Sequence, residues 1–279
     1  MPGKQVTELD ALPSFTDNSL LPVHNGAGLK KGLLSQLADY LGKKFSNPNL
    51  LINPDFKINQ RGKTEYTSNG YTVDRWKINL GTVKPSSSGI TITLNNKGQF
   101  IQLFENALNG TYTASIKITS ITGDCVLFVG SHSLQLKKAG VFTFTENGSV
   151  NGVSLYKSTA GTCTINVEYI KLEQGSVATP FVAPNPAEEL TKCYRFKYIG
   201  KAVLRGRCTA NQIFGFTKDL PTKLRTKPTT TFKSKNSYNV NTVDVTLAEE
   251  NNAVYLAGTA ENTNQTVIEV VLDLDAEIY

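Results

Sequence analysis

The chain has 279 residues, of which 39% are hydrophobic, and a formal net charge of +6. This length allows a sizeable buried core and suggests one to three domains. No apolar run reaches the length of a membrane span, and Met1–Lys4 lacks the apolar stretch of a secretory signal. We therefore expect a protein that is made in a cytoplasm and does not insert into a membrane.

The first 48 residues predict a hairpin followed by one amphipathic helix. An Asn-Gly turn at residues 25–28 separates two short strands. The helix runs from residue 33 to about residue 45. Its apolar positions recur at three- and four-residue steps, which places them on one face: Leu34, Leu37, Leu41 and Phe45. So short a helix is marginal alone, so this stripe packs either on its own hairpin or against other copies on a symmetry axis.

Residues 49–184 predict a β-sandwich. Short alternating strands follow one another with Asn-Gly, Lys-Gly and Ala-Gly turns between them, and no helical pattern intervenes. The run Cys125–Val129 is continuously apolar and predicts a buried strand. Pro180 and Pro184 predict a stiff exit linker.

Residues 185–279 predict a second β domain with a short leading helix. Asn185 suits the N-cap, Pro186 suits the first helical position, and the glutamates that follow favour the positive end of the helix dipole. Basic residues fill 190–235 and acidic residues fill 236–279. This asymmetry indicates either a basic surface for nucleic acid or anionic glycan, or pairing of the two halves. Because both charges lie in one domain, pairing is favoured and no nucleic-acid partner is predicted.

The residues needed for catalysis are sparse. The two histidines, His24 and His132, lie in different predicted modules, and no P-loop, G-x-S-x-G or H-E-x-x-H motif occurs. We predict a protein that is not an enzyme and needs no cofactor. The four cysteines contain no Cys-x-x-Cys pair, so buried free thiols are expected: Cys125, Cys163, Cys193 and Cys208.

Several phrases resemble one family. The chain reads NLLINPDFKINQRG from Asn49, DRW from Asp74, KLEQGSVATPF from Lys171, PAEEL from Pro186 and DAEIY from Asp275. These phrases resemble bacteriophage fibre and receptor-binding proteins that carry a jelly-roll, carbohydrate-binding-like module. The N-terminal segment is similar to the virion-attachment end of such fibres. The resemblance implies a mainly β protein with an attachment segment at 1–48, a jelly-roll β-sandwich at 49–184 and a C-terminal β domain at 185–279.

The resemblance implies a virion protein, assembled in a bacterial cytoplasm as a homotrimer, that docks on another virion protein through residues 1–48 and attaches to a host-cell glycan. The candidate glycan-binding residues are Tyr66 and Tyr71, which flank the polar loop after the first phrase, together with Arg75 and Trp76 of the DRW phrase. Trp76 follows Val73 by three residues, which also fits a core position. Calcium is common in such sandwiches, and oxygens could come from Asp55, Glu105, Asp124 and Glu168, but they form no clustered motif and no metal is predicted. The alternatives are a head fibre or decoration protein without a receptor role, and a free carbohydrate-binding or polysaccharide-degrading protein.

Overall fold

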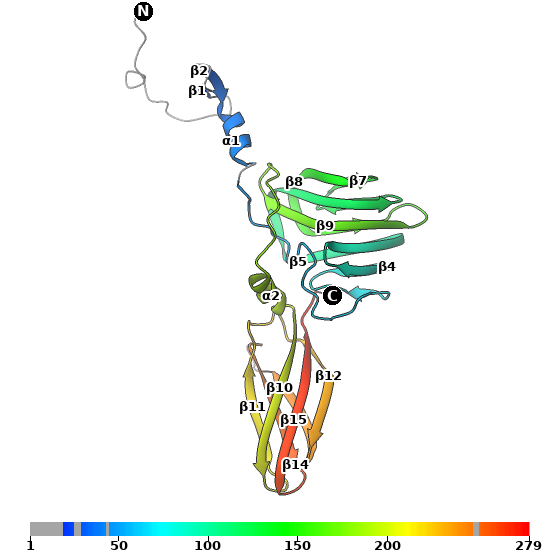
Figure 1. Cartoon of the computed structure of the whole chain (residues 1–279), viewed down its shortest axis with the longest axis vertical. Coiled ribbons are helices and arrows are strands. Elements are labelled where there is room, and N and C mark those ends of the chain that lie inside the picture. The colour runs from blue at the N-terminus through cyan, green and yellow to red at the C-terminus, as the bar shows by residue number, and fades with distance from the viewer. Residues whose placement is uncertain (1–18, 25–28, 43–44, 248–250, 279) are drawn as a thin grey trace, which may run out of the picture. The chain divides into compact units, whose positions relative to one another are not determined.

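The computed structural model describes residues 19–24, 29–42, 45–247 and 251–278 (Figure 1). The described chain is mainly β, as predicted, with strands β1–β15 and the short helices α1 and α2. It forms two compact units, one of residues 1–48 with 177–182 and the other of residues 49–176 with 183–279. No helix among the described residues is long and apolar enough to cross a membrane.

The first unit contains the predicted hairpin and helix. Strand β1 (Leu20–His24) pairs antiparallel with β2 (Leu29–Leu33), and α1 (Leu34–Gly42) follows directly. Ser46 Oγ donates to the Pro180 carbonyl oxygen at 2.7 Å, and the Asn47 N–H donates to Thr179 Oγ1 at 2.9 Å. These bonds tie residues 177–182 to this unit, although the sequence placed them at the end of the sandwich. The part of the predicted attachment segment before residue 19 lies outside the described residues.

The central module is a sandwich-like arrangement of antiparallel strands, consistent with a jelly roll. Its strands are β3 (Gly70–Tyr71), β4 (Lys77–Ser86), β5 (Gly89–Thr122), β6 (Cys125–Val129), β7 (His132–Leu136), β8 (Gly140–Tyr156) and β9 (Cys163–Gln174). The hydrogen-bonded strand pairs form two groups. In the first group, β9 lies between the first and last parts of β5. In the second group, residues 99–103 of β5 lie between β4 and β8. Strand β6 then pairs with β8, and β7 pairs with β6. The long strands β4, β5 and β8 pass from one group to the other at register shifts.

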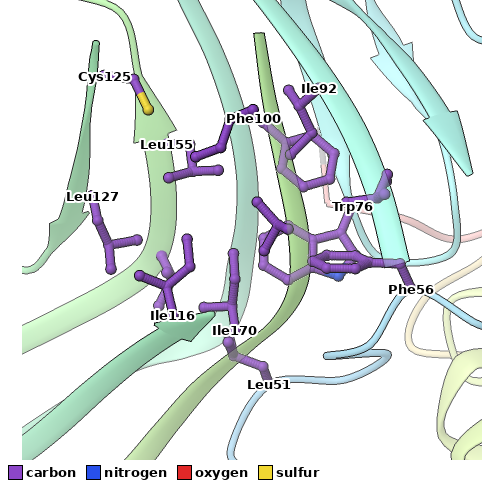
Figure 2. Close-up of a cluster of buried hydrophobic side chains, with 14 of the residues drawn as sticks. Leu51, Phe56, Trp76, Ile92, Phe100, Ile116, Cys125, Leu127, Leu155 and Ile170 are labelled. Carbon is purple, nitrogen blue, oxygen red and sulfur yellow. The ribbon is translucent and has the colours of Figure 1, made fainter. Parts of the chain in front are cut away.

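Three aromatic rings form the centre of the sandwich core (Figure 2). The ring of Trp76 stacks on Phe100 with centroids 4.9 Å apart, and Phe56 lies 5.3 Å from Trp76. The Trp76 indole N–H donates to the Asn53 carbonyl oxygen at 2.9 Å, which satisfies the one polar atom of that side chain. The buried Trp76 side chain therefore holds the start of the loop 53–62 against the core.

The C-terminal module begins with α2 (Pro186–Tyr194). As predicted, Asn185 caps this helix, because its side chain accepts from the Ala187 N–H at 2.9 Å. Two three-stranded sheets follow, with a second hydrophobic core among them. One sheet has the order β10 (Lys197–Cys208), β15 (Asn264–Asp275), β12 (Thr229–Tyr238); the other has the order β11 (Ile213–Asp219), β14 (Ala253–Ala260), β13 (Val240–Leu247). The four cysteines are free and buried, as predicted.

Candidate functional site

The four residues predicted to bind glycan do not form an open surface. The exposed fractions are 0% for Trp76, 2% for Arg75 and 5% for Tyr66, and a sugar cannot stack on rings enclosed by protein. Tyr71 is half-buried, and its hydroxyl donates to the Ile278 carbonyl oxygen. Burial, with the charge of Glu277 nearby, raises the pKa of Tyr71 to about 12. Their positions therefore give no support to a glycan site here, because the chain folds back over this loop.

These residues belong instead to a joint between the sandwich and the C-terminal module. The Arg75 guanidinium forms an ion pair with Glu277 at 2.5 Å, and both side chains are at most 2% exposed. Arg75 also donates to the Leu103 carbonyl oxygen at 2.7 Å, and its guanidinium lies 3.5 Å from the centroid of the Phe196 ring. One arginine thus contacts both modules, and its charge is balanced within the protein.

The "INQRG" loop supplies the second part of the joint. Gln60 Nε2 donates to Asp74 Oδ2 and to the Lys197 carbonyl oxygen, each at 2.6 Å. Arg61 lies 3.7 Å from the Asp74 carboxylate and 3.4 Å from that of Asp275. Burial raises the pKa of the Asp74 carboxyl despite the hydrogen bonds from Gln60 and the nearby positive charge of Arg61. For Asp275, burial acts in the same direction, but the Lys197 ammonium, the Glu277 N–H and the Arg61 charge together lower the pKa.

The third part of the joint is formed by residues of the "NPDF" and "PAEEL" phrases, which contact each other. The Asn53 N–H donates to Glu189 Oε1 of α2 at 2.5 Å, and Lys192 balances that carboxylate at 2.9 Å. The Asn53 side chain donates to the carbonyl oxygens of Ile58 and Asp74, which closes its own loop. Four of the phrases that carry the family resemblance, NLLINPDFKINQRG, DRW, PAEEL and DAEIY, thus contain residues that join the modules, and the interactions of this cluster are structural.

A groove on the outside of the sandwich has the features of a binding surface. It measures about 200 Å³ and is lined by Ile101, Leu103, Phe128, Gly130, Ser149, Asn151, Gly152 and Ser154. We call it the outer groove. Its floor follows the strand register, since Ser154 of β8 lies opposite both Ile101 of β5 and Phe128 of β6. The ring of Tyr156 contacts Phe128 edge-on at 6.0 Å, which extends the apolar floor.

Gly152 is required at this place by close packing. A Cβ there would overlap the Gln102 carbonyl oxygen and lie 3.2 Å from Leu103 Cα on the neighbouring strand. Because Gly152 has no side chain, the surface of the groove beside Leu103 is not filled at this position.

A buried carboxylate fixes the turn next to the outer groove. Glu146 accepts from the Ser131 hydroxyl at 3.2 Å, from the His132 N–H at 3.0 Å and from His132 Nδ1. Burial raises the pKa of this carboxyl, but the bonds from His132 and Ser131 outweigh it, so that the pKa is lowered. His132 is exposed, as the sequence suggested. The Ser131 hydroxyl donates to the carboxylate and not to the imidazole, so the three groups lack the nucleophile–base bond of a hydrolase.

Of the four residues predicted for docking, Leu37 and Leu41 are exposed on α1, and Phe45 lies beyond the end of this helix, which is shorter than predicted. Leu37 and Leu41 are each 42% exposed and Phe45 is 67% exposed, while Leu34 is half-buried. Docking on a virion protein stays a prediction.

The candidate calcium ligands do not converge. Glu105 forms an ion pair with Arg195 at 2.8 Å, Asp124 with Lys157 at 2.9 Å, and Glu168 with Lys117 at 2.7 Å. Within the described ranges, no three His, Cys, Asp or Glu side chains are grouped to hold a metal ion.

Comparisons with known proteins identify no family. No protein-family model and no curated protein matches the chain. Among solved structures, the chain is similar to wild-type discoidin II from Dictyostelium discoideum at 7% identity, over 66% of this chain and 78% of that one, with a TM-score of 0.21. Similarity this low supports no functional argument.

Proposed function

We propose that this protein is a carbohydrate-binding fibre or spike protein of a bacteriophage virion, and that the outer groove is its glycan site. The observation that carries the proposal is the groove itself, where an aromatic and aliphatic floor is bordered by hydroxyl and amide groups. Sugars bind to such surfaces because their C–H faces lie on apolar rings while their hydroxyls bond to polar groups.

The residues that line the outer groove suggest which of them would contact each part of a sugar. Phe128 and Ile101 would contact the flat face of a sugar ring, and the Asn151 amide and the Ser149 hydroxyl would bond to its hydroxyls. A groove of about 200 Å³ is smaller than a typical small-molecule pocket, so we expect low affinity for each copy. Several copies held together raise the apparent affinity by 10²–10⁴-fold or so, which is the benefit of a trimeric fibre.

The fibre assignment is supported by the sequence phrases and by two structural features. The joint connects the C-terminal module to the sandwich through the ion pairs Arg75–Glu277 and Arg61–Asp275, which suits a protein whose modules act as one fibre. The exposed side chains of Leu37, Leu41 and Phe45 offer apolar surface for other copies or for a virion protein. Sedimentation of the full chain should give three times the mass of one chain, and a monomer would end the trimeric proposal.

Glycan-array binding tests the groove. Phe128→Ala and Asn151→Ala should abolish or strongly weaken a signal that the parent protein gives. Tyr255→Ala is the matched control, because this aromatic residue is 43% exposed on the other module. Unchanged binding by both groove variants would reject the site. No binding of any host glycan would favour a decoration protein, and turnover of host polysaccharide would favour a degrading one.

A further inference from the structure

Charge is balanced along only half of the strand pair β10–β15. The two strands run antiparallel in unbroken register from Lys197 opposite Asp275 to Cys208 opposite Asn264. At the end nearest the joint, Lys197 forms ion pairs with the carboxylates of Asp273 and Asp275. This half confirms the pairing of basic and acidic segments that the sequence favoured.

Glu269 is the last residue of β15 in this direction whose acidic side chain balances a basic side chain of β10. That carboxylate forms an ion pair with Lys201 at 2.5 Å, and Arg205 adds a smaller attraction that also lowers its pKa. Beyond it, the outward positions of β15 are Val267 and Gln265, which lie opposite Arg205 and Arg207. The basic side chains thus continue for two more positions after the acidic ones have ended.

These two arginines lie at an open hollow. It measures about 520 Å³ and is lined by Arg205, Gly206, Arg207, Asn264 and Gln265. Both arginines are exposed. The side-chain oxygen of Asn264 accepts from the Gln265 N–H at 2.8 Å, which orients that amide at the edge of the hollow. Guanidinium groups bind carboxylates and other oxyanions through paired N–H donors, and amides bind hydroxyls.

An aromatic side chain completes the surface. Tyr238 of β12 lies opposite Val267 across β15, and Arg205 lies opposite Val267 on the other side, so both project from the same face of the sheet. Adjacent strands are about 4.8 Å apart, which places Tyr238 roughly 10 Å from Arg205, about the span of a disaccharide. Tyr238 is 60% exposed. Figure 1 shows β10, β15 and β12 side by side in this order.

We propose that Arg205, Arg207, Asn264, Gln265 and Tyr238 form a second binding site, specific for an acidic sugar within a glycan. The arginines bind the carboxylate, the amides bind hydroxyls, and the tyrosine ring contacts the sugar face. This distal arginine site lies in the C-terminal module and does not depend on the outer groove.

Binding of soluble polymers at about 0.15 M salt, where long-range attraction is screened, tests the proposal. The probes are polygalacturonate, uncharged dextran and duplex DNA. Polygalacturonate should bind and dextran should not. Replacing both arginines, Arg205→Gln and Arg207→Gln, should weaken polygalacturonate binding by about tenfold or more. Tyr238→Ala should weaken it by several-fold, while Phe128→Ala, which tests the outer groove, should leave it unchanged.

The double variant Lys223→Gln and Lys227→Gln is the charge-matched control, since it removes the same positive charge from exposed positions of the same module. It should bind polygalacturonate within about twofold of the parent, because screening leaves little effect of distant charges. Equal losses in the two double variants would overturn the proposal in favour of diffuse attraction. Absence of polygalacturonate binding, or stronger binding of duplex DNA through the two arginines, would also overturn it. Thermal unfolding of each variant confirms that the change lies in binding and not in folding.

Discussion

Arg75 and Glu277 are 202 positions apart in the chain and form a buried ion pair at 2.5 Å. Glu277 also accepts from the Arg75 N–H at 3.2 Å, so the carboxylate holds both the side chain and the backbone of the arginine. This pair is the centre of the joint, and several expectations about stability depend on it.

Removal of one partner should be costly. Glu277→Ala leaves the Arg75 charge buried without its carboxylate, and we expect a loss of about 3–5 kcal/mol in the free energy of unfolding. The exposed pair Lys84–Glu65 is the control, and Glu65→Ala should cost at most about 1 kcal/mol. Urea denaturation of both variants measures the difference, and a similar small loss in the two would show that the joint adds no stability.

The contribution of Asp275 to the joint should weaken in acid. The pKa of Asp275 is lowered in the folded protein, so this group contributes stability above its unfolded pKa of about 3.9 that is lost as the pH falls through the folded value. Asp275→Asn should therefore destabilise the protein at neutral pH, and the difference from the parent should shrink below pH ~4. Unfolding at several pH values tests this, and a difference that stays constant would contradict it.

Trp76 should act through the core alone. Trp76→Phe leaves a cavity beside Phe100 and removes the bond to the Asn53 carbonyl, and we expect a loss of roughly 2–4 kcal/mol. At temperatures where the variant stays folded, glycan binding should equal that of the parent. If Trp76→Phe keeps the melting temperature of the parent but loses glycan binding, Trp76 takes part in binding and this prediction is wrong.

The backbone at the outer groove should tolerate no side chain. Gly152→Ala should cost about 1–3 kcal/mol, since its Cβ would overlap the Gln102 carbonyl oxygen. Gly206→Ala is the control, because a Cβ there has no neighbour within 4 Å among the described residues. Equal melting temperatures for the two variants would show that the strands separate easily at Gly152.

Much of the fold follows from local patterns. Alternation of apolar and polar residues gives most of the strands, and Asn185 with Pro186 gives the start of α2. The three-residue step from Val73 to Trp76 correctly raised the core alternative for Trp76. The outer groove was missed because its residues come from three separate strands, and because the apolar run Cys125–Val129 was interpreted as wholly buried although Phe128 is half-exposed.

The sequence by itself determined the β-rich class, the helix cap, the free thiols and the opposed charges of the C-terminal module. Tertiary structure alone decided which charges meet. Lys197 lies against Asp273 and Asp275 while Arg205 and Arg207 are left open, because strand register matches positions that are dozens of residues apart. It also decided that the "INQRG" and "DRW" phrases form a buried joint, because a polar side chain has the same local pattern whether it contacts solvent or another module.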